Sequence, residues 1–85
     1  MNEDKKLLFK TILSLKTVDD CQEFFDDLCT IKEIEAMAQR IKAAKLLMEN
    51  KTYEQIINET LISSATLSRV SRCVQYGKGY KKFIK

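Results

Sequence analysis

Small hydroxyl residues and arginines recur at helical spacing between Ser63 and Tyr76, and these residue types could recognise DNA. The outer face of a helix over this segment would carry Ser64, Ala65, Thr66, Ser68, Arg69, Arg72 and Gln75. Small residues at a helix N-terminus let the helix approach base edges in the major groove, and arginine can reach guanine or phosphate. The pattern predicts a recognition helix over Ser63–Tyr76.

Apolar residues predict how this helix is held. They recur at helical spacing in the preceding segment and on the opposite face of the recognition helix, at Tyr53, Ile56, Ile57 and Thr60, then at Leu67, Val70 and Val74. Thr52 can cap the first helix and Ser63 or Ser64 the second, because a side-chain oxygen there satisfies a backbone N–H without an intrahelical partner. Residues 52–76 are therefore predicted to form a helix-turn-helix.

Two positions depart from the usual pattern of that motif. The turn normally carries glycine where the chain needs a positive φ, and Leu61 stands there, at a cost of about 1–2 kcal/mol. The middle of the first helix is normally small, so that the helices cross closely, and here it is Ile57. Periodicity alone fits a small all-α protein that never meets nucleic acid equally well.

Charge is distributed unevenly along the chain and favours the DNA interpretation. Residues 1–29 have a net charge of −3, whereas residues 60–85 contain six lysines and arginines and no acid. A basic half suits a polyanionic partner, although lysine-rich tails can also serve solubility alone. We add to the candidate DNA contacts the hydroxyls and lysines that flank the recognition helix: Thr52, Ser63, Lys78, Lys81 and Lys82.

The chain of 85 residues lacks proline and dense β-branched alternation, which predicts a single all-α domain of six helices. We expect two helices over residues 3–15 and 18–29, with Thr17 as the N-cap of the second. A long central helix over residues 30–50 begins with a T-x-x-E capping box at Thr30, and its apolar stripe comprises Ile34, Met37, Ala38, Ile41, Ala44, Leu47 and Met48. The helix-turn-helix follows, and a basic C-terminal segment, residues 77–85, could add a short last helix.

The first two helices expose more apolar surface than so short a chain readily buries. Phe9, Phe24 and Phe25 accompany many leucines in residues 1–29. We therefore expect these helices to form a homodimer interface. A dimer also suits DNA, because two recognition helices about one helical turn apart can bind a two-fold operator.

Catalytic and metal-binding chemistry finds little support. Histidine is absent, and the chain has no glycine-rich phosphate loop. Cys21, Cys29 and Cys73 are an odd number without a C-x-x-C pair, which argues against zinc and disulfides. We expect no enzyme activity, no cofactor and no metal. Cys21 is predicted to be a buried free thiol, which together with the lack of a signal peptide or membrane-spanning run suggests the cytoplasm.

The segment Thr30–Thr52 and the run A-T-x-S-R-V-x-R-C-x-x-Y-G-x-G-Y at Ala65–Tyr80 resemble the Trp repressor-like proteins of the YerC/YecD group. The likeness covers residues 16–85. It implies a bacterial six-helix fold, an intertwined dimer and a cytoplasmic DNA-binding transcriptional regulator, with repression as the expected activity. The alternative is a helical dimer that acts through a protein partner, with its motif degraded at Leu61 and Ile57.

The resemblance also implies an effector pocket, because the Trp repressor holds tryptophan between two arginines beside a glycine. The matching residues here are Arg40 and Arg69, with Thr30 as a further pocket residue and Val70 in place of the glycine. A valine occupies the space of the ligand, and overfilling a packed site costs about 1–3 kcal/mol. We therefore expect no tryptophan response, with Arg40 paired to a neighbouring acid; an unknown smaller effector is the alternative.

Overall fold

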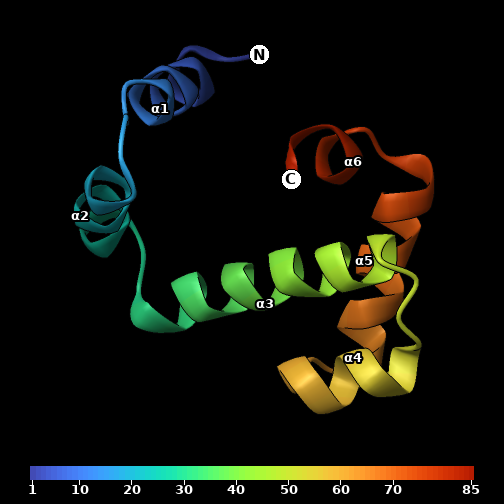
Figure 1. Ribbon diagram of the computed structural model, residues 1–85. Coiled ribbons are helices and arrows are strands. Elements are labelled where there is room, and N and C mark those ends of the chain that lie inside the picture. Colours follow the sequence, from blue (N-terminus) through green and yellow to red (C-terminus); the bar gives the residue numbers. More distant parts are fainter. The chain divides into compact units, whose positions relative to one another are not determined.

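Six helices and no strand make up the computed structural model, which describes residues 1–85 (Figure 1). The helices are α1 (Glu3–Leu13), α2 (Val18–Leu28), α3 (Ile31–Met48), α4 (Tyr53–Thr60), α5 (Ser64–Tyr76) and α6 (Gly79–Phe83). The all-α, six-helix prediction is confirmed. The predicted helices over 3–15 and 30–50 are slightly too long, since α1 ends at Leu13 and α3 at Met48. None of these helices is both long and apolar enough to cross a membrane.

Capping side chains fix the beginnings of the first five helices, whereas α6 has no side-chain cap. At α3, Thr30 Oγ1 accepts from the Glu33 N–H at 3.1 Å, and the Glu33 carboxylate accepts from the Thr30 N–H at 2.8 Å. That backbone hydrogen bond lowers the pKa of Glu33 from its ordinary value. Thr52 and Gln55 form the same reciprocal pair at α4. The predicted cap at Thr30 is confirmed. At α4 the structure adds Gln55, whose side chain completes a capping box that the sequence pattern did not predict.

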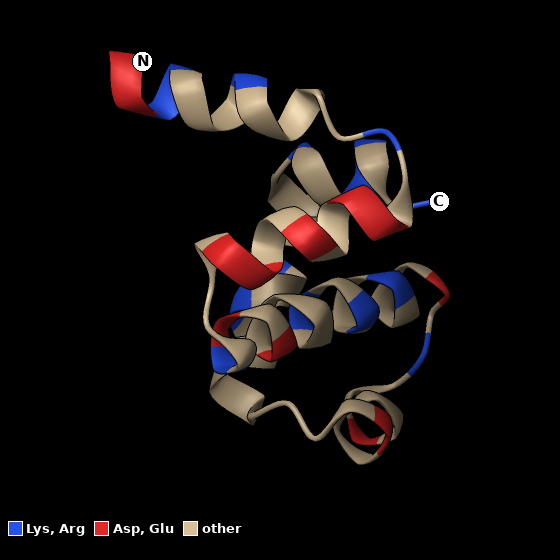
Figure 2. Ribbon diagram, turned by 90° about the vertical axis from the view of Figure 1, so that its left-hand side faces the viewer, with Lys and Arg blue, Asp and Glu red and all other residues tan.

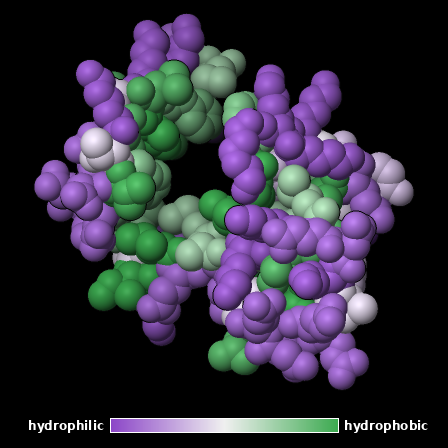
Figure 3. All heavy atoms as spheres, in the orientation of Figure 1, coloured by the Kyte–Doolittle hydropathy of each residue, from purple (hydrophilic) through white to green (hydrophobic).

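The chain divides into two compact units, Met1–Ile34 and Glu35–Lys85. In the first unit neither α1 nor α2 contains a buried residue. Leu13 and Val18 are 82% and 83% exposed, and Figure 3 shows hydrophobic side chains at the surface of these helices. The Phe24 and Phe25 rings meet edge to face, 5.5 Å apart. The prediction that Cys21 is buried is wrong for the single chain, because this thiol is exposed.

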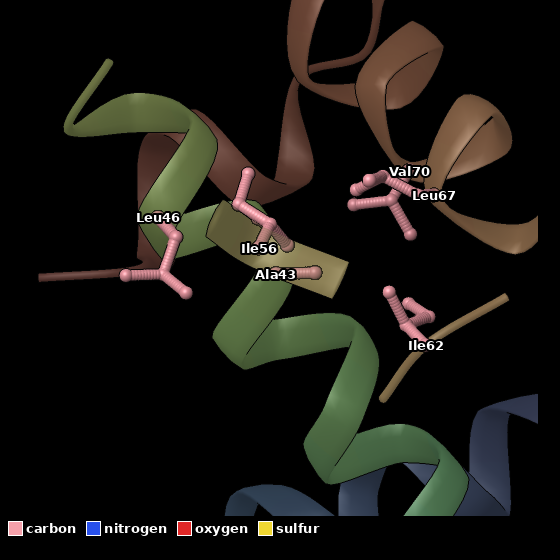
Figure 4. Packing of buried hydrophobic residues seen from close by; sticks show 7 residues of the cluster. Ala43, Leu46, Ile56, Ile62, Leu67 and Val70 are labelled. Carbon is pink, nitrogen blue, oxygen red and sulfur yellow. The ribbon is translucent and has the colours of Figure 1, made fainter. Parts of the chain in front are cut away.

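The second unit contains the hydrophobic core. Its buried residues come from α3, α4, α5 and the turn between α4 and α5: Ala43, Ala44, Leu46, Ile56, Ile62, Leu67 and Val70 (Figure 4). Tyr80 and Ile84, on and just after α6, pack against this cluster. The core faces predicted for α4 and α5 are confirmed at Ile56, Leu67 and Val70, where the side chains point toward one another.

The apolar stripe predicted for α3 is only partly correct. Ala43, which lies outside that stripe, is fully buried together with Ala44, whereas Ile41 is 51% exposed. The residues that α3 contributes to the core lie in its C-terminal half, at Ala43, Ala44 and Leu46. Apolar periodicity shows that a helix has a nonpolar side, but not which part of that side the same chain covers.

Candidate nucleic-acid interface

The turn between α4 and α5 consists of Leu61, Ile62 and Ser63. Leu61 adopts the left-handed conformation with φ 60° and ψ 19°, as its place in the motif predicts, and its side chain is 81% exposed. Ile62 instead turns into the core. The turn is therefore built without glycine, and the burial of Ile62 is one contribution that offsets the strain at Leu61.

Hydrogen bonds hold the same turn in place. Thr60 Oγ1 donates to the Ile56 carbonyl at 2.7 Å and accepts from the Ile62 N–H at 3.3 Å. Gln39 Nε2, on α3, donates to the Thr60 carbonyl at 3.1 Å. The last turn of α4 is thus tied to α3, and this contact helps to fix the position of the first helix of the pair.

At the N-terminus of α5, one hydroxyl side chain caps the helix and others are exposed on its surface. Ser63 Oγ accepts from the Thr66 N–H at 3.2 Å and donates to Thr66 Oγ1 at 2.9 Å, so its hydroxyl serves mainly to cap the helix. Ser64, Ala65 and Ser68 are exposed on the helix surface, while Thr66 is half-buried. The exposed small residues are the candidate base-facing set.

Positive charge continues from this face into α6. Arg69 and Arg72 are exposed, and α5 has no acidic residue. Figure 2 colours the basic residues blue, and it shows the contrast with the acidic residues along α2. Among the lysines, Lys81 Nζ donates to the Gln75 carbonyl at 3.0 Å, near the C-terminus of α5. Lys82 Nζ lies 5.4 Å from the centre of the Phe83 ring.

The remaining candidate contacts lie at the helix ends. Thr52 is the exposed N-cap of α4, and its oxygen accepts from Gln55, which leaves the hydroxyl proton free to donate. Lys78 is exposed at the start of α6. No group of three or more histidine, cysteine, aspartate or glutamate side chains is placed to hold a metal ion.

A hollow of about 430 Å³ lies beside α5. It is lined by residues of α3, α5 and α6: Arg40, Thr66, Arg69, Val70, Cys73 and Tyr80. The structure thus brings together three of the residues that the resemblance assigns to an effector pocket. Thr30 is not among the lining residues; it caps α3 roughly 15 Å along the helix from Arg40.

Cys73 and Tyr80 are residues of this hollow that the sequence analysis does not anticipate. Cys73 follows Arg69 by one helical turn, so its spacing could have revealed it. Tyr80 comes from α6, and only the packing of that helix against the core brings it there. No carboxylate lines the hollow, so the acid expected to pair with Arg40 is not found in it.

The comparison with known families gives the class of protein: a family of regulatory DNA-binding proteins that are not enzymes. The family described as Trp repressor protein matches residues 3–85, and the chain belongs to this family.

Known relatives place the chain more closely, among YerC-type members. It is 56% identical over 70 residues to the uncharacterized protein YerC of Bacillus subtilis (strain 168), covering 82% of this chain and 67% of YerC.

Solved structures show the same fold. A TrpR-like protein from Eubacterium eligens ATCC 27750 is 46% identical with a TM-score of 0.91, and the match covers 94% of this chain and 84% of that one. A proposed Trp repressor from Staphylococcus aureus is 40% identical with a TM-score of 0.92, and the match covers 95% and 82%.

Proposed function

We propose that this protein is a sequence-specific transcriptional regulator, a repressor that binds a two-fold DNA operator as a homodimer in the cytoplasm. The exposed face of α5 carries the proposal, because it places Ser64 and Ser68 beside Arg69 and Arg72 without any acid. Hydroxyls and arginines on one helix face supply donors for base edges and phosphates. Membership of a DNA-binding family supports it.

Each segment has its own part in this proposal. Residues 1–29 form the dimer interface, residues 30–50 the central helix, residues 52–76 the helix-turn-helix and residues 77–85 the basic C-terminal segment. The exposed apolar residues of α1 and α2 support the first assignment, because a dimer would remove them from water. Lys78, Lys81 and Lys82 would contact phosphates beside the recognition helix.

Replacing Arg72 by alanine tests the recognition face. We expect the Arg72→Ala protein to lose about 1–3 kcal/mol of operator affinity if the guanidinium contacts a base, with the melting temperature almost unchanged because the side chain is exposed. Operator fragments would come from selection of bound genomic DNA, and affinity would be measured by fluorescence anisotropy. Parental affinity of the variant for every duplex would show that the proposed face is wrong.

A competing function is a helical dimer that acts through a protein partner. The exposed Leu61 side chain in the turn favours it, because an apolar residue at such a position can serve a protein contact. Affinity for random duplex DNA at increasing salt distinguishes the two functions. A steep fall indicates released phosphate contacts and supports the DNA regulator, while a flat, weak response favours the protein partner.

We also propose that the protein does not respond to tryptophan. Val70 is only 2% exposed and belongs to the core, so its side chain fills the position that glycine leaves open in the Trp repressor. A ring seated where that glycine leaves space would overlap the Val70 side chain, and the hollow of about 430 Å³ lies beside this side chain rather than in its place. Calorimetric titration with L-tryptophan should therefore give no saturable heat. Saturable binding at micromolar concentration, together with tighter operator binding, would contradict this expectation.

A further inference from the structure

One side-chain hydrogen bond joins the helix-turn-helix to α3. Gln39 Nε2 donates to the Thr60 carbonyl at 3.1 Å, across 21 positions of the sequence. Every other side-chain hydrogen bond connects residues at most six positions apart. The Gln39 side chain is half-buried, so water competes less for this bond than it would at the open surface.

The other contacts between α3 and this motif are apolar. Gln39 stands one helical turn before the fully buried Ala43, on the same side of α3. Ala43 belongs to one cluster with Ile56 and Leu67. Burial of apolar surface is non-directional, whereas a hydrogen bond weakens steeply when its angle changes. The Gln39 bond therefore restricts the orientation of α4 on α3 more narrowly than the core contacts do.

Thr60 connects this restraint to the start of α5. Its carbonyl is among the last four of α4, which lack an intrahelical partner, and Gln39 satisfies it. The Thr60 hydroxyl is bonded to the Ile56 carbonyl and to the Ile62 N–H. The N-cap of α5, Ser63, follows directly after Ile62. A shift of Thr60 would therefore move the N-terminus of α5, where the candidate base-facing residues begin.

We propose that Gln39 is a positioning residue for DNA binding, which holds α4 and α5 of the DNA-free protein in the orientation that fits the major groove. The inference rests on the proposed DNA-binding function and adds to it a residue that acts through Thr60 rather than on DNA. Without the Gln39 amide the motif samples other orientations, and only the correctly oriented fraction binds the operator at full affinity. Loss of one hydrogen bond should lower that fraction about three- to tenfold.

The test compares operator and random duplex DNA for full-length Gln39→Met and parent proteins. Methionine keeps the length of the side chain and removes its N–H donors. We expect operator affinity to fall about three- to tenfold and affinity for random DNA to fall less, because base contacts demand the more exact orientation. The salt dependence should keep its parental slope, since no phosphate contact is lost.

Lys42→Met is the control, because it places the same side chain at an exposed position of α3. The charge that it removes acts on both duplexes alike, so the ratio of operator to random affinity should stay parental. Melting curves confirm that each variant is folded at the assay temperature. Parental operator affinity in folded Gln39→Met would overturn the inference. An equal fall on both duplexes would overturn it too, since that result indicates a general effect on the fold.

Arg72→Ala separates this inference from the proposed function. If Gln39→Met binds as the parent does while Arg72→Ala loses operator affinity, the positioning role is overturned and the DNA-binding function survives. If the parent protein binds no genomic fragment more tightly than random DNA, both are overturned.

Nuclear magnetic resonance of the unmodified, DNA-free protein tests the hydrogen bond even if Gln39→Met does not fold. We expect the Gln39 side-chain amide protons to exchange with water more slowly than those of the exposed Gln22, and to show nuclear Overhauser contacts to Thr60. Equal exchange of the two amides without such contacts would overturn the inference.

Discussion

Leu61 shows how one residue can carry backbone strain without disrupting its motif. Its φ of 60° places it in the left-handed region, and 81% of its side chain remains exposed. Because the Leu61 side chain is exposed, it contributes little hydrophobic stabilisation. The conformation of the turn therefore depends on the neighbouring residues. Ile62 is buried, and Thr60 ties the end of α4 to the turn through its hydroxyl. The strain is tolerated because the surrounding contacts fix the chain path.

Replacing Leu61 by glycine should stabilise the protein. Relief of about 1–2 kcal/mol of strain is offset by the roughly 0.5–1 kcal/mol that glycine loses in backbone entropy, which leaves a gain of about 0–1.5 kcal/mol. Leu61→Ala is the control, since alanine keeps the same steric conflict and should bring no comparable gain. Urea unfolding measures both variants. An equal gain from alanine would show that side-chain exposure, and not φ, limits stability here.

At the scale of elements, the junction between α5 and α6 depends on Gly77. A Cβ atom there would lie 2.6 Å from the Cys73 carbonyl oxygen, which accepts the Gly77 N–H at 2.8 Å. Gly79 differs, because a Cβ atom at that residue meets nothing within 4 Å. The first glycine is thus needed for the close approach that ends α5, and it directs the chain toward the packing of Tyr80.

Gly77→Ala should therefore destabilise the chain while Gly79→Ala should not. We expect a loss of about 1–3 kcal/mol for the first substitution, because backbone atoms must shift. The second should be neutral or favourable, since alanine has the better helix propensity. Thermal unfolding by circular dichroism compares the pair. Equal stability of the two variants would mean that the junction adjusts freely.

At the scale of the whole molecule, the two ends of the chain have different surfaces. The first unit has helices without buried residues, and the second contains the core and the basic face. Apolar side chains that a single chain leaves exposed are typical of surfaces covered by a second copy. The proposed homodimer, if formed through these surfaces, would have no separate monomer stability, so we expect its unfolding to depend on protein concentration.

Removal of residues 1–29 should give an aggregating or unfolded chain, and the full-length protein should be a dimer at micromolar concentration by light scattering. Leu13→Glu should weaken that dimer, since it introduces a charge at an 82% exposed apolar position. Lys5→Glu, a charge change at a polar position of α1, is the control. A well-folded monomer from either the truncated or the full-length protein would argue against the dimer.

Local interactions made much of this structure predictable from sequence. Capping at Thr30 and Ser63, the buried face through Leu67 and Val70 and the left-handed Leu61 all depend on residues within about one helical turn of each other. The outer face of α5 follows from the same periodicity. Side-chain type and spacing alone therefore determined the helices and the candidate base-facing surface.

Contacts between distant segments decided the rest. The burial of Ala43 and the exposure of Ile41 depend on where α4 and α5 pack along α3, which helical periodicity does not encode. Arg40 and Tyr80 meet beside Arg69 only because α3 and α6 both pack near α5. Thr30, assigned by resemblance to the same pocket, caps α3 and does not line the hollow within the single chain. Which arginines lie in one site therefore depends on the tertiary structure, because it requires the packing of helices that are far apart in the chain.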